Sequence, residues 1–400
     1  MRTRGTLRLA TRGSTLARRQ AALVQEQLEE RGYEVELVTV ETTGDQIRDE
    51  LIHRLGKTGA FVRELDERVL DGDLDGAIHS MKDMPTEQPS ELVTAAIPQR
   101  GRPGDALVTP DGTSLEELPE GATVGTSSLR RRAQLLSERP DLEVEPLRGN
   151  VDTRLEKLLA PALQEEHAER SDADKERKGD TGGYKPDYED KNTDDDEDDE
   201  TNNQTVDEWF DGLSEIEKQA LGREIETEYD AIVLAEAGLE RSGLAHHVEY
   251  EQLSKKTFVP APGQGALAVT ATDGETARNI QSAIDHPRSR AETTVERTLL
   301  SELGGGCIAP IGIYAIVQGE YVQARVTVFD RDGEESVLAN RDLPVETHAD
   351  AAIEFARDLE DRGAAELIAE ARKDGETETD ENEADTDQNL PDREDQPEGK

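Results

Sequence analysis

The N-terminal part of the chain alternates between strand-like and helical patterns of apolar positions. Ser14 can cap a helix that runs to about Arg31, because apolar residues recur there at helical spacing. A second helix is expected at residues 60–70. Short apolar or alternating runs predict strands at residues 7–11, 34–40, 76–79 and 92–97. This order of strands and helices predicts a parallel or mixed sheet covered by helices.

The same rhythm restarts after a segment rich in proline and glycine at residues 98–104. Helices are expected at residues 129–138 and 151–159. The strands of this second unit are expected at residues 122–125, 142–146 and 229–235, the last with a buried-type apolar run. The chain therefore contains two successive α/β units.

A different pattern follows from about residue 284 to residue 372. A helix at residues 290–303 precedes three strand-like runs, and a helix at residues 349–372 closes the unit. The runs lie at residues 311–318, 321–329 and 335–340. This order is typical of a small α+β domain.

Two stretches break these patterns. Residues 161–228 are polar and acidic, and only residues 206–225, around Trp209 and Phe210, could form a short helical piece. We expect most of this stretch to be a solvated insertion in a surface loop, since loop closure entropy grows slowly with length. Residues 373–400 form a second acidic stretch, which we expect to be a disordered tail.

The charge of the chain is extreme: 91 acidic residues face 46 lysines and arginines, for a formal net charge of −45. Because the acidic residues are spread through segments with clear periodicity, we interpret the composition as a halophile's cytoplasmic protein rather than a disordered one. No apolar run approaches the length of a membrane span or a signal segment. The acidic surface disfavours nucleic-acid binding, so basic clusters stand out.

Three such clusters lie where a strand leads into a helix, at residues 12–14, 125–132 and 148–154. Backbone amides at a helix start favour anions, and the arginine fork matches a carboxylate. Taken singly, each has a plainer explanation as a capped helix or a solvated basic face. Together they suggest a cleft for a ligand with several carboxylates or phosphates, although no nucleotide-type phosphate loop is present.

Two further features could carry chemistry. Asp83 follows a short strand, where ligands bind in open α/β sheets, but an Asp before Pro85 could equally start a turn. His79 is expected to pack in the strand, and no second histidine lies at metal spacing. Cys307 is the only cysteine, so it has no disulfide partner within the chain. It follows three glycines and is either a small buried residue or an attachment point.

These segments together resemble one family, hydroxymethylbilane synthase, also called porphobilinogen deaminase. The matching pieces are Ala-Thr-Arg-Gly-Ser at 10–14, Thr-Gly-Asp at 43–45, His-Ser-Met-Lys-Asp-Met-Pro at 79–85, Gly-Thr-Ser-Ser-Leu-Arg-Arg at 125–131, Arg-Gly-Asn-Val-Asp-Thr-Arg at 148–154, Tyr-Asp-Ala-Ile-Val-Leu-Ala at 229–235, Pro-Ala-Pro-Gly-Gln-Gly-Ala at 260–266 and Gly-Gly-Cys at 305–307. They occur in the family's order over nearly the whole folded chain.

The resemblance implies an α/β fold of two lobes like those of periplasmic binding proteins, plus a smaller C-terminal α+β domain. Lobe 1 would comprise residues 1–98 and about 266–283, lobe 2 residues 99–265, and the third domain residues 284–372. The resemblance also implies a monomer located in the cytoplasm. This enzyme would join four porphobilinogen molecules, with loss of ammonia, onto a covalently bound dipyrromethane cofactor. Hydrolysis then releases hydroxymethylbilane.

The resemblance assigns roles to individual residues. Cys307 would anchor the dipyrromethane, and Asp83 would be the catalytic carboxylate that stabilises positive charge on the reacting pyrroles. The cofactor would also be bound by Arg12, Ser14, Asp45, Lys82, Thr126, Ser128, Arg130, Arg131, Arg148, Asn150 and Arg154. The substrate would be bound by Arg12, Arg148, Arg154 and Gln264. No metal is implied.

The chain departs from the family at one lysine. The family's Lys-Gly-Leu-Phe segment appears here as Gly-Lys-Thr-Gly-Ala-Phe at 56–61, with Lys57 displaced by one position. Two other functions remain open from the residues alone. A binding protein for a polyanionic ligand would leave Asp83 and Cys307 idle. A thiol-based redox or acyl-transfer enzyme would need a base near Cys307, and no histidine lies near it in sequence.

Overall fold

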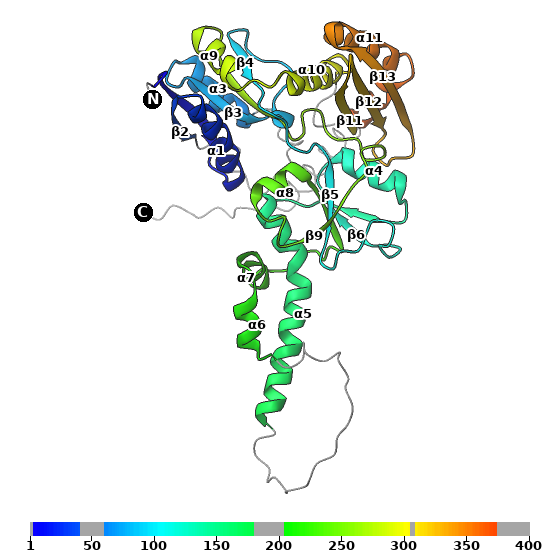
Figure 1. The fold of residues 1–400 in the computed structure, drawn as a ribbon. Helices are drawn as coiled ribbons and strands as arrows, with labels where there is room; N and C mark the ends of the chain where they lie inside the picture. Colours follow the sequence, from blue (N-terminus) through cyan, green and yellow to red (C-terminus); the bar gives the residue numbers. More distant parts are fainter. Residues whose placement is uncertain (1–2, 41–59, 180–203, 305–308, 374–400) are drawn as a thin grey trace, which may run out of the picture.

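The computed structural model describes residues 3–40, 60–179, 204–304 and 309–373, and it contains three sheets. Two are mixed sheets of five strands, and the third is an antiparallel sheet of three strands. Figure 1 shows the two five-stranded units one above the other, with the three-stranded unit beside the first. The predicted α/β fold with a smaller C-terminal α+β unit is confirmed.

The first sheet has the strand order β2-β1-β3-β10-β4. Its strands are β1 (Thr6–Arg12), β2 (Glu34–Val40), β3 (Gly76–Ser80), β4 (Leu92–Ala96) and β10 (Leu267–Thr272). β1 pairs in parallel with β2 and β3, whereas β10 runs antiparallel between β3 and β4. Its helices are α1 (Thr15–Glu30), α3 (Ala60–Leu70) and α9 (Glu275–Ile284). The return of β10 to this sheet agrees with a lobe built from two separate stretches of chain.

The second sheet has the order β7-β6-β8-β5-β9. Its strands are β5 (Asp105–Thr109), β6 (Thr123–Gly125), β7 (Glu143–Glu145), β8 (Ala231–Ala235) and β9 (Glu249–Gln252). Its helices are α4 (Leu129–Glu138), α5 (Val151–Gly179) and α8 (Glu236–Ser242). β8 is buried at four of its five residues, as its apolar run predicts.

Two crossover segments, residues 97–104 and 259–266, join the two five-stranded units and lie side by side. The Gly101 amide donates to the Gly265 carbonyl at 3.0 Å, and Arg241 Nη2 on α8 donates to the same oxygen at 2.7 Å. Gly265 has a φ of +81°, and a Cβ there would lie 2.8 Å from the Gly101 carbonyl oxygen. Glycine is therefore required where the crossovers touch.

The third unit packs helices on one antiparallel sheet. It comprises α10 (Pro287–Glu302), β11 (Ile311–Gln318), β12 (Tyr321–Phe329), β13 (Ser336–Pro344), the 3-10 turn η4 (Val345–Thr347) and α11 (His348–Glu360). The single closing helix predicted at residues 349–372 is wrong. The chain turns at residues 361–363, where Gly363 has a φ of +97°, and a separate helix follows at residues 364–373.

The expectation of a solvated insertion is wrong for residues 161–179, whereas the helical piece expected at residues 206–225 is confirmed. α5 continues through Pro161 to Gly179, and α6 (Val206–Gly212) and α7 (Glu215–Leu221) lie beside it. Ala160, Leu163, Trp209 and Ala220 form a small core between them. This helical arm extends away from the second sheet (Figure 1). Apolar contacts between distant segments stabilise it, which local composition does not reveal.

Residues 180–203 and 374–400, the remainder of the acidic stretches, lie outside the described residues. In the described parts of the chain, no helix combines the length and the apolar character needed to cross a membrane.

Candidate active site

Asp83 lies in a short turn at the end of β3. This turn, η1 (Met81–Asp83), begins where the Met81 amide donates to the Ala266 carbonyl at 3.0 Å, so the second crossover holds it. Met81 and Met84 are buried, and between them Lys82 and Asp83 face outward. The Lys82 ammonium lies 2.6 Å from Asp83 Oδ1. The local pattern of apolar and polar residues thus presents a carboxylate beside a cation.

Asp83 is held in its charged form. Burial raises its pKa, but the charges of Lys82 and Arg12 and hydrogen bonds from Lys82 and Ser80 outweigh it, so the pKa lies below the ordinary value. One side of the side chain stays open, with 45% of its surface exposed. Arg12 acts on Asp83 although 71 positions separate them in sequence. The structure therefore brings these two predicted site residues together.

His79 is confirmed as a packing residue. Its Nε2 lies 3.0 Å from Asp66 Oδ1 and 3.1 Å from Thr270 Oγ1, inside the first unit. Within the described part of the chain, no group of three or more potential ligand side chains could hold a metal ion.

The first predicted anion junction lies between β1 and α1. The Ser14 hydroxyl accepts a hydrogen bond from the Ala17 amide at 3.2 Å and caps the helix. Its own proton stays available for donation to a ligand. Arg12, the last residue of β1, is half-buried at the same corner. The predicted cap is confirmed, and it places Arg12 and Ser14 next to each other.

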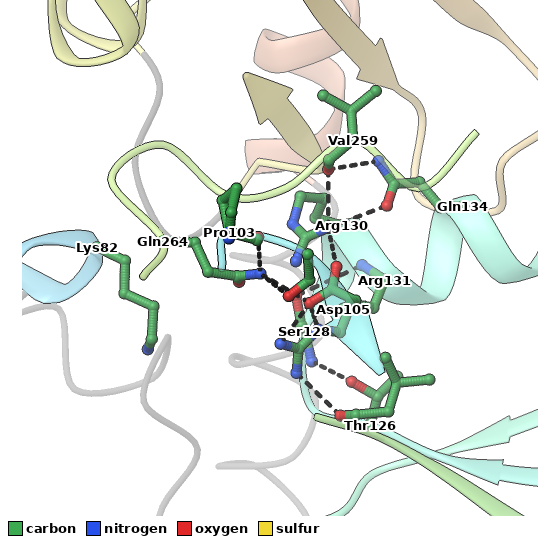
Figure 2. Close-up of polar contacts among 12 residues, drawn as sticks. Lys82, Pro103, Asp105, Thr126, Ser128, Arg130, Arg131, Gln134, Val259 and Gln264 are labelled. Atoms are coloured by element: carbon green, nitrogen blue, oxygen red, sulfur yellow. Dashed lines mark hydrogen bonds and ion pairs between the residues drawn. The ribbon is translucent and has the colours of Figure 1, made fainter. Parts of the chain in front are cut away.

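The second junction has a different geometry from that expected, because Arg130 and Arg131 both point into the protein. Arg130 Nη1 donates to Asp105 Oδ2 at 2.8 Å, and Arg131 donates to Asp105 Oδ1 from Nε and Nη2 at 3.0 and 2.8 Å. Gln264 Nε2 reaches the same oxygen at 3.0 Å. Figure 2 shows these side chains converging on Asp105, with Lys82 lying apart from them. Arg132 is the partly exposed member of the run, as three successive helix residues cannot share one face.

Asp105, the first residue of β5, was not predicted from the sequence. Burial raises its pKa, but Arg130, Arg131 and Gln264 lower it more, to about 2. The carboxylate is therefore a permanent anion between two guanidiniums. An acidic residue directly before the apolar run at residues 106–108 was the available signal, since a charge at such a position needs a buried partner.

Thr126 and Ser128 shape the start of α4. The Ser128 amide donates to Thr126 Oγ1 at 3.2 Å, and Ser128 Oγ accepts from the Arg131 amide at 3.4 Å. Ser128 is half-buried and keeps a donor proton, while Thr126 is buried.

The third junction begins α5. Asn150 Oδ1 accepts from the Thr153 amide at 2.8 Å, and Arg154 Nε donates to the Gly149 carbonyl at 2.8 Å. Burial and the charge of Arg131 lower the pKa of Arg154 to about 10. Among the described residues, no carboxylate pairs with Arg154. Arg148 is half-buried beside it in sequence. At Arg154 the junction therefore carries a positive charge that no carboxylate of the described residues neutralises.

Gln264 lies in the second crossover and contacts the first crossover. The Gln264 amide nitrogen also donates to the carbonyls of Pro103 and Gly104, whereas its Oε1 is buried without a partner among the described residues. Asp45, Lys57 and Cys307 lie outside the described residues. The chain leads toward Cys307 from α10, and the Gly304 carbonyl accepts from Arg372 Nη2.

Comparison with known proteins shows which family this arrangement represents. Residues 7–166 and 216–279 match the family model "Porphobilinogen deaminase, dipyromethane cofactor binding domain", and residues 291–361 match "Porphobilinogen deaminase, C-terminal domain". The unmatched residues 167–215 include the C-terminal end of α5 and all of α6.

Individual relatives cover nearly the whole chain. A protein named "Probable porphobilinogen deaminase" from Halobacterium salinarum is 53% identical over 92% of this chain and 98% of its own length. A protein of the same name from Methanococcoides burtonii is 37% identical over 91% and 96%. The solved structure of the methionine binding protein MetQ matches 70% of this chain and 89% of its own at 13% identity, with a TM-score of 0.32. The two family models and these relatives place the chain in the porphobilinogen deaminase family.

Proposed function

We propose that this porphobilinogen deaminase (EC 2.5.1.61) uses Asp83 as its catalytic carboxylate and Cys307 as the attachment point of its dipyrromethane cofactor. The deaminase activity and the cofactor-binding domain follow from the family. The residue roles are the proposal, and they rest on the charges around Asp83 and Arg154. The alternative function, a non-catalytic binding protein for a polyanionic ligand, is rejected because the family consists of enzymes.

The single observation that carries the proposal is the positive charge at Arg154, which no carboxylate among the described residues pairs with. A half-buried guanidinium with a lowered pKa gains free energy when an anion pairs with it. Both the substrate and the dipyrromethane group carry acetate and propionate side chains. The donor set therefore fits the group that the family implies.

The proposed binding residues differ in how directly they can reach a ligand. Arg12, Arg148, Arg154 and Lys82 would supply charge, while Ser14, Ser128 and Asn150 would supply donors at three helix starts. Arg130, Arg131 and Thr126 act from within the protein, where Arg131 adds to the positive potential at Arg154. Gln264 would act through its unpartnered Oε1 as an acceptor. Asp45 would approach from the segment that follows β2.

Asp83 has the protonation state that the reaction needs. Joining pyrroles with loss of ammonia develops positive charge on the substrate, and an ionised carboxylate beside it stabilises that charge. Lys82 and Arg12 keep Asp83 ionised and orient it. When bound, the dipyrromethane group supplies the pyrrole to which the first substrate molecule is joined.

Intact-mass spectrometry of the purified protein tests the attachment site. We expect the mass to exceed that of the polypeptide by two linked pyrrole units, and Cys307→Ala to lose the excess. Since Cys307 is the only cysteine, the variant has no alternative thiol. A fully active protein at its bare polypeptide mass, or an excess that persists in Cys307→Ala, would contradict the proposal. The same preparation run on a sizing column tests the expected monomer, and cell fractionation tests the expected cytoplasmic location.

A further inference from the structure

Arg297 connects the C-terminal unit to the turn that carries Asp83. It lies on α10, and its Nη2 donates to the Pro85 carbonyl at 2.6 Å while Nη1 donates to the Met84 carbonyl at 3.3 Å. Burial lowers the pKa of Arg297, and among the described residues no carboxylate balances its charge. Arg297 is half-buried, and a partly desolvated cation without a counter-ion costs stability. Here both of its contacts go to the two residues that follow Asp83.

Glu296, the preceding residue of α10, holds the second crossover. It pairs with Arg100 through contacts of 2.8 and 3.0 Å, and its Oε2 accepts from the Gly263 amide at 2.7 Å. Gly263 has a φ of +74°, and a Cβ there would lie 2.8 Å from Met81 Cγ in the Asp83 turn. Adjacent residues of one helix therefore fix the turn directly and through the crossover that supports it.

The same helix leads to the cofactor attachment point. α10 ends at Glu302, five positions before Cys307. With a rise of about 1.5 Å per residue, Arg297 lies about 8 Å along the axis from that end. A regular helix is a rigid spacer over this distance. The position of the Asp83 turn is thus tied to the C-terminal end of α10.

We propose that Arg297 is a positioning residue that keeps the Asp83 turn in register with α10, the helix that precedes Cys307 in sequence. The inference rests on the proposed function, in which Asp83 acts on pyrroles tethered at Cys307. Holding reacting groups in place contributes strongly to catalysis, and a displacement of about 1 Å can cost about a hundredfold in rate. Loss of the Arg297 contacts should therefore slow the chemistry without removing the ligand-binding arginines.

Arg297→Met and Arg297→Lys test this role. The methionine preserves side-chain length without the charge, and we expect kcat to fall roughly ten- to a hundredfold while KM changes less than about twofold. The lysine can reach only one of the two carbonyls, so its kcat should be intermediate. Intact mass should show the dipyrromethane still attached in both. Arg288→Met is the matched control, since Arg288 lies on the same helix but donates its hydrogen bonds to Glu292 and Val317, away from the Asp83 turn.

The pH profile separates positioning from general loosening of the fold. If the turn shifts, Asp83 loses part of the influence of Arg12, Lys82 and Ser80, and the acid limb of kcat should move to higher pH in Arg297→Met but not in Arg288→Met. Wild-type kcat in folded Arg297→Met, or equal loss in Arg297→Met and Arg297→Lys, would overturn the proposal. Loss of the attached mass together with activity would overturn it as well. Normal turnover by Asp83→Asn would instead refute the proposed function itself.

Discussion

Arg131 Nη2 lies 2.8 Å from Asp105 Oδ1, and both side chains are buried between α4 and the first crossover. Arg130 binds the other carboxylate oxygen at the same distance. One anion thus faces two cations, which leaves a net positive charge inside the second unit. Burial lowers the pKa of Arg154 at the neighbouring helix start, and the charge of Arg131 lowers it further. The internal ion cluster therefore adds to the positive potential at Arg154.

The lowered pKa of Asp105 makes stability depend on pH. Its folded pKa of about 2 lies below the ordinary value of 3.8, so its stabilisation is present above about pH 4 and is lost as pH falls toward about 2. The shift corresponds to about 2 kcal/mol. Asp105→Asn should lower the melting temperature at neutral pH, because two buried guanidiniums lose their counter-ion, at a cost of about 3–5 kcal/mol.

Melting curves from neutral to acid pH at constant salt check this expectation. The gap in melting temperature between wild type and Asp105→Asn should narrow below about pH 4. Asp141→Asn is a suitable control, since Asp141 pairs with Arg139 at a partly exposed site. A gap that stays constant through the acid range would show that Asp105 titration does not contribute.

Asp83→Asn should keep the fold and lose most turnover. The amide has nearly the same shape as the carboxylate but no charge, so it cannot stabilise a developing cation. Removing one electrostatic stabiliser in a preorganised site costs about a hundred- to a thousandfold in kcat. Steady-state formation of the tetrapyrrole measures the loss of turnover. An unchanged circular dichroism spectrum would show that the fold is kept. Turnover near the wild-type rate would remove Asp83 from the catalytic role.

Arg154→Gln should weaken binding of carboxylate-bearing ligands. A hydrogen bond to a charged group contributes about 1.5–3 kcal/mol, so we expect a roughly ten- to a hundredfold loss in kcat/KM or incomplete cofactor loading. Arg223→Gln is the control, because Arg223 already has a carboxylate partner. It pairs at 3.1 Å with Glu156, which lies on α5 as Arg154 does. Equal kinetics in the two variants would argue that Arg154 binds no ligand.

The helical arm should unfold before the rest of the protein. Trp209 is the only tryptophan of the chain, and it packs in the arm against Arg170, at 5.6 Å from its ring, and near His167. Its fluorescence therefore reports on the arm alone. The core of the arm is small, and the net charge of −45 favours expansion when salt is low.

A salt titration followed by Trp209 fluorescence and by far-ultraviolet circular dichroism compares the unfolding of the arm with that of the whole chain. As salt is lowered, Trp209 fluorescence should change at a higher salt concentration than the far-ultraviolet circular dichroism of the whole chain. Deaminase activity should persist while only the arm is unfolded, because α6 and the end of α5 lie outside the residues that match the two family models. Coincident transitions, or equal stability in dilute buffer and molar salt, would contradict the expectation.

Local patterns predicted the elements that local forces form. The strand at residues 34–40 matches β2, the helix at residues 129–138 matches α4, and Ser14 and Ser128 cap their helices. These features depend on the alternation of apolar residues and on hydrogen bonds within a few positions. The prediction of one continuous closing helix was wrong because Gly363 adopts a left-handed conformation, which the helical spacing around it does not reveal.

The sequence by itself determined the order of the elements, the place of three basic clusters at strand-to-helix junctions and, through the ordered segments, the family. Only the tertiary structure decided that Arg130 and Arg131 turn inward to Asp105, that Arg297 holds the Asp83 turn, and that α5 extends into a packed arm. Each of these depends on residues that lie far apart in the chain. Periodicity and capping describe what a segment can form, whereas a buried charge is satisfied by whichever partner the fold brings to it.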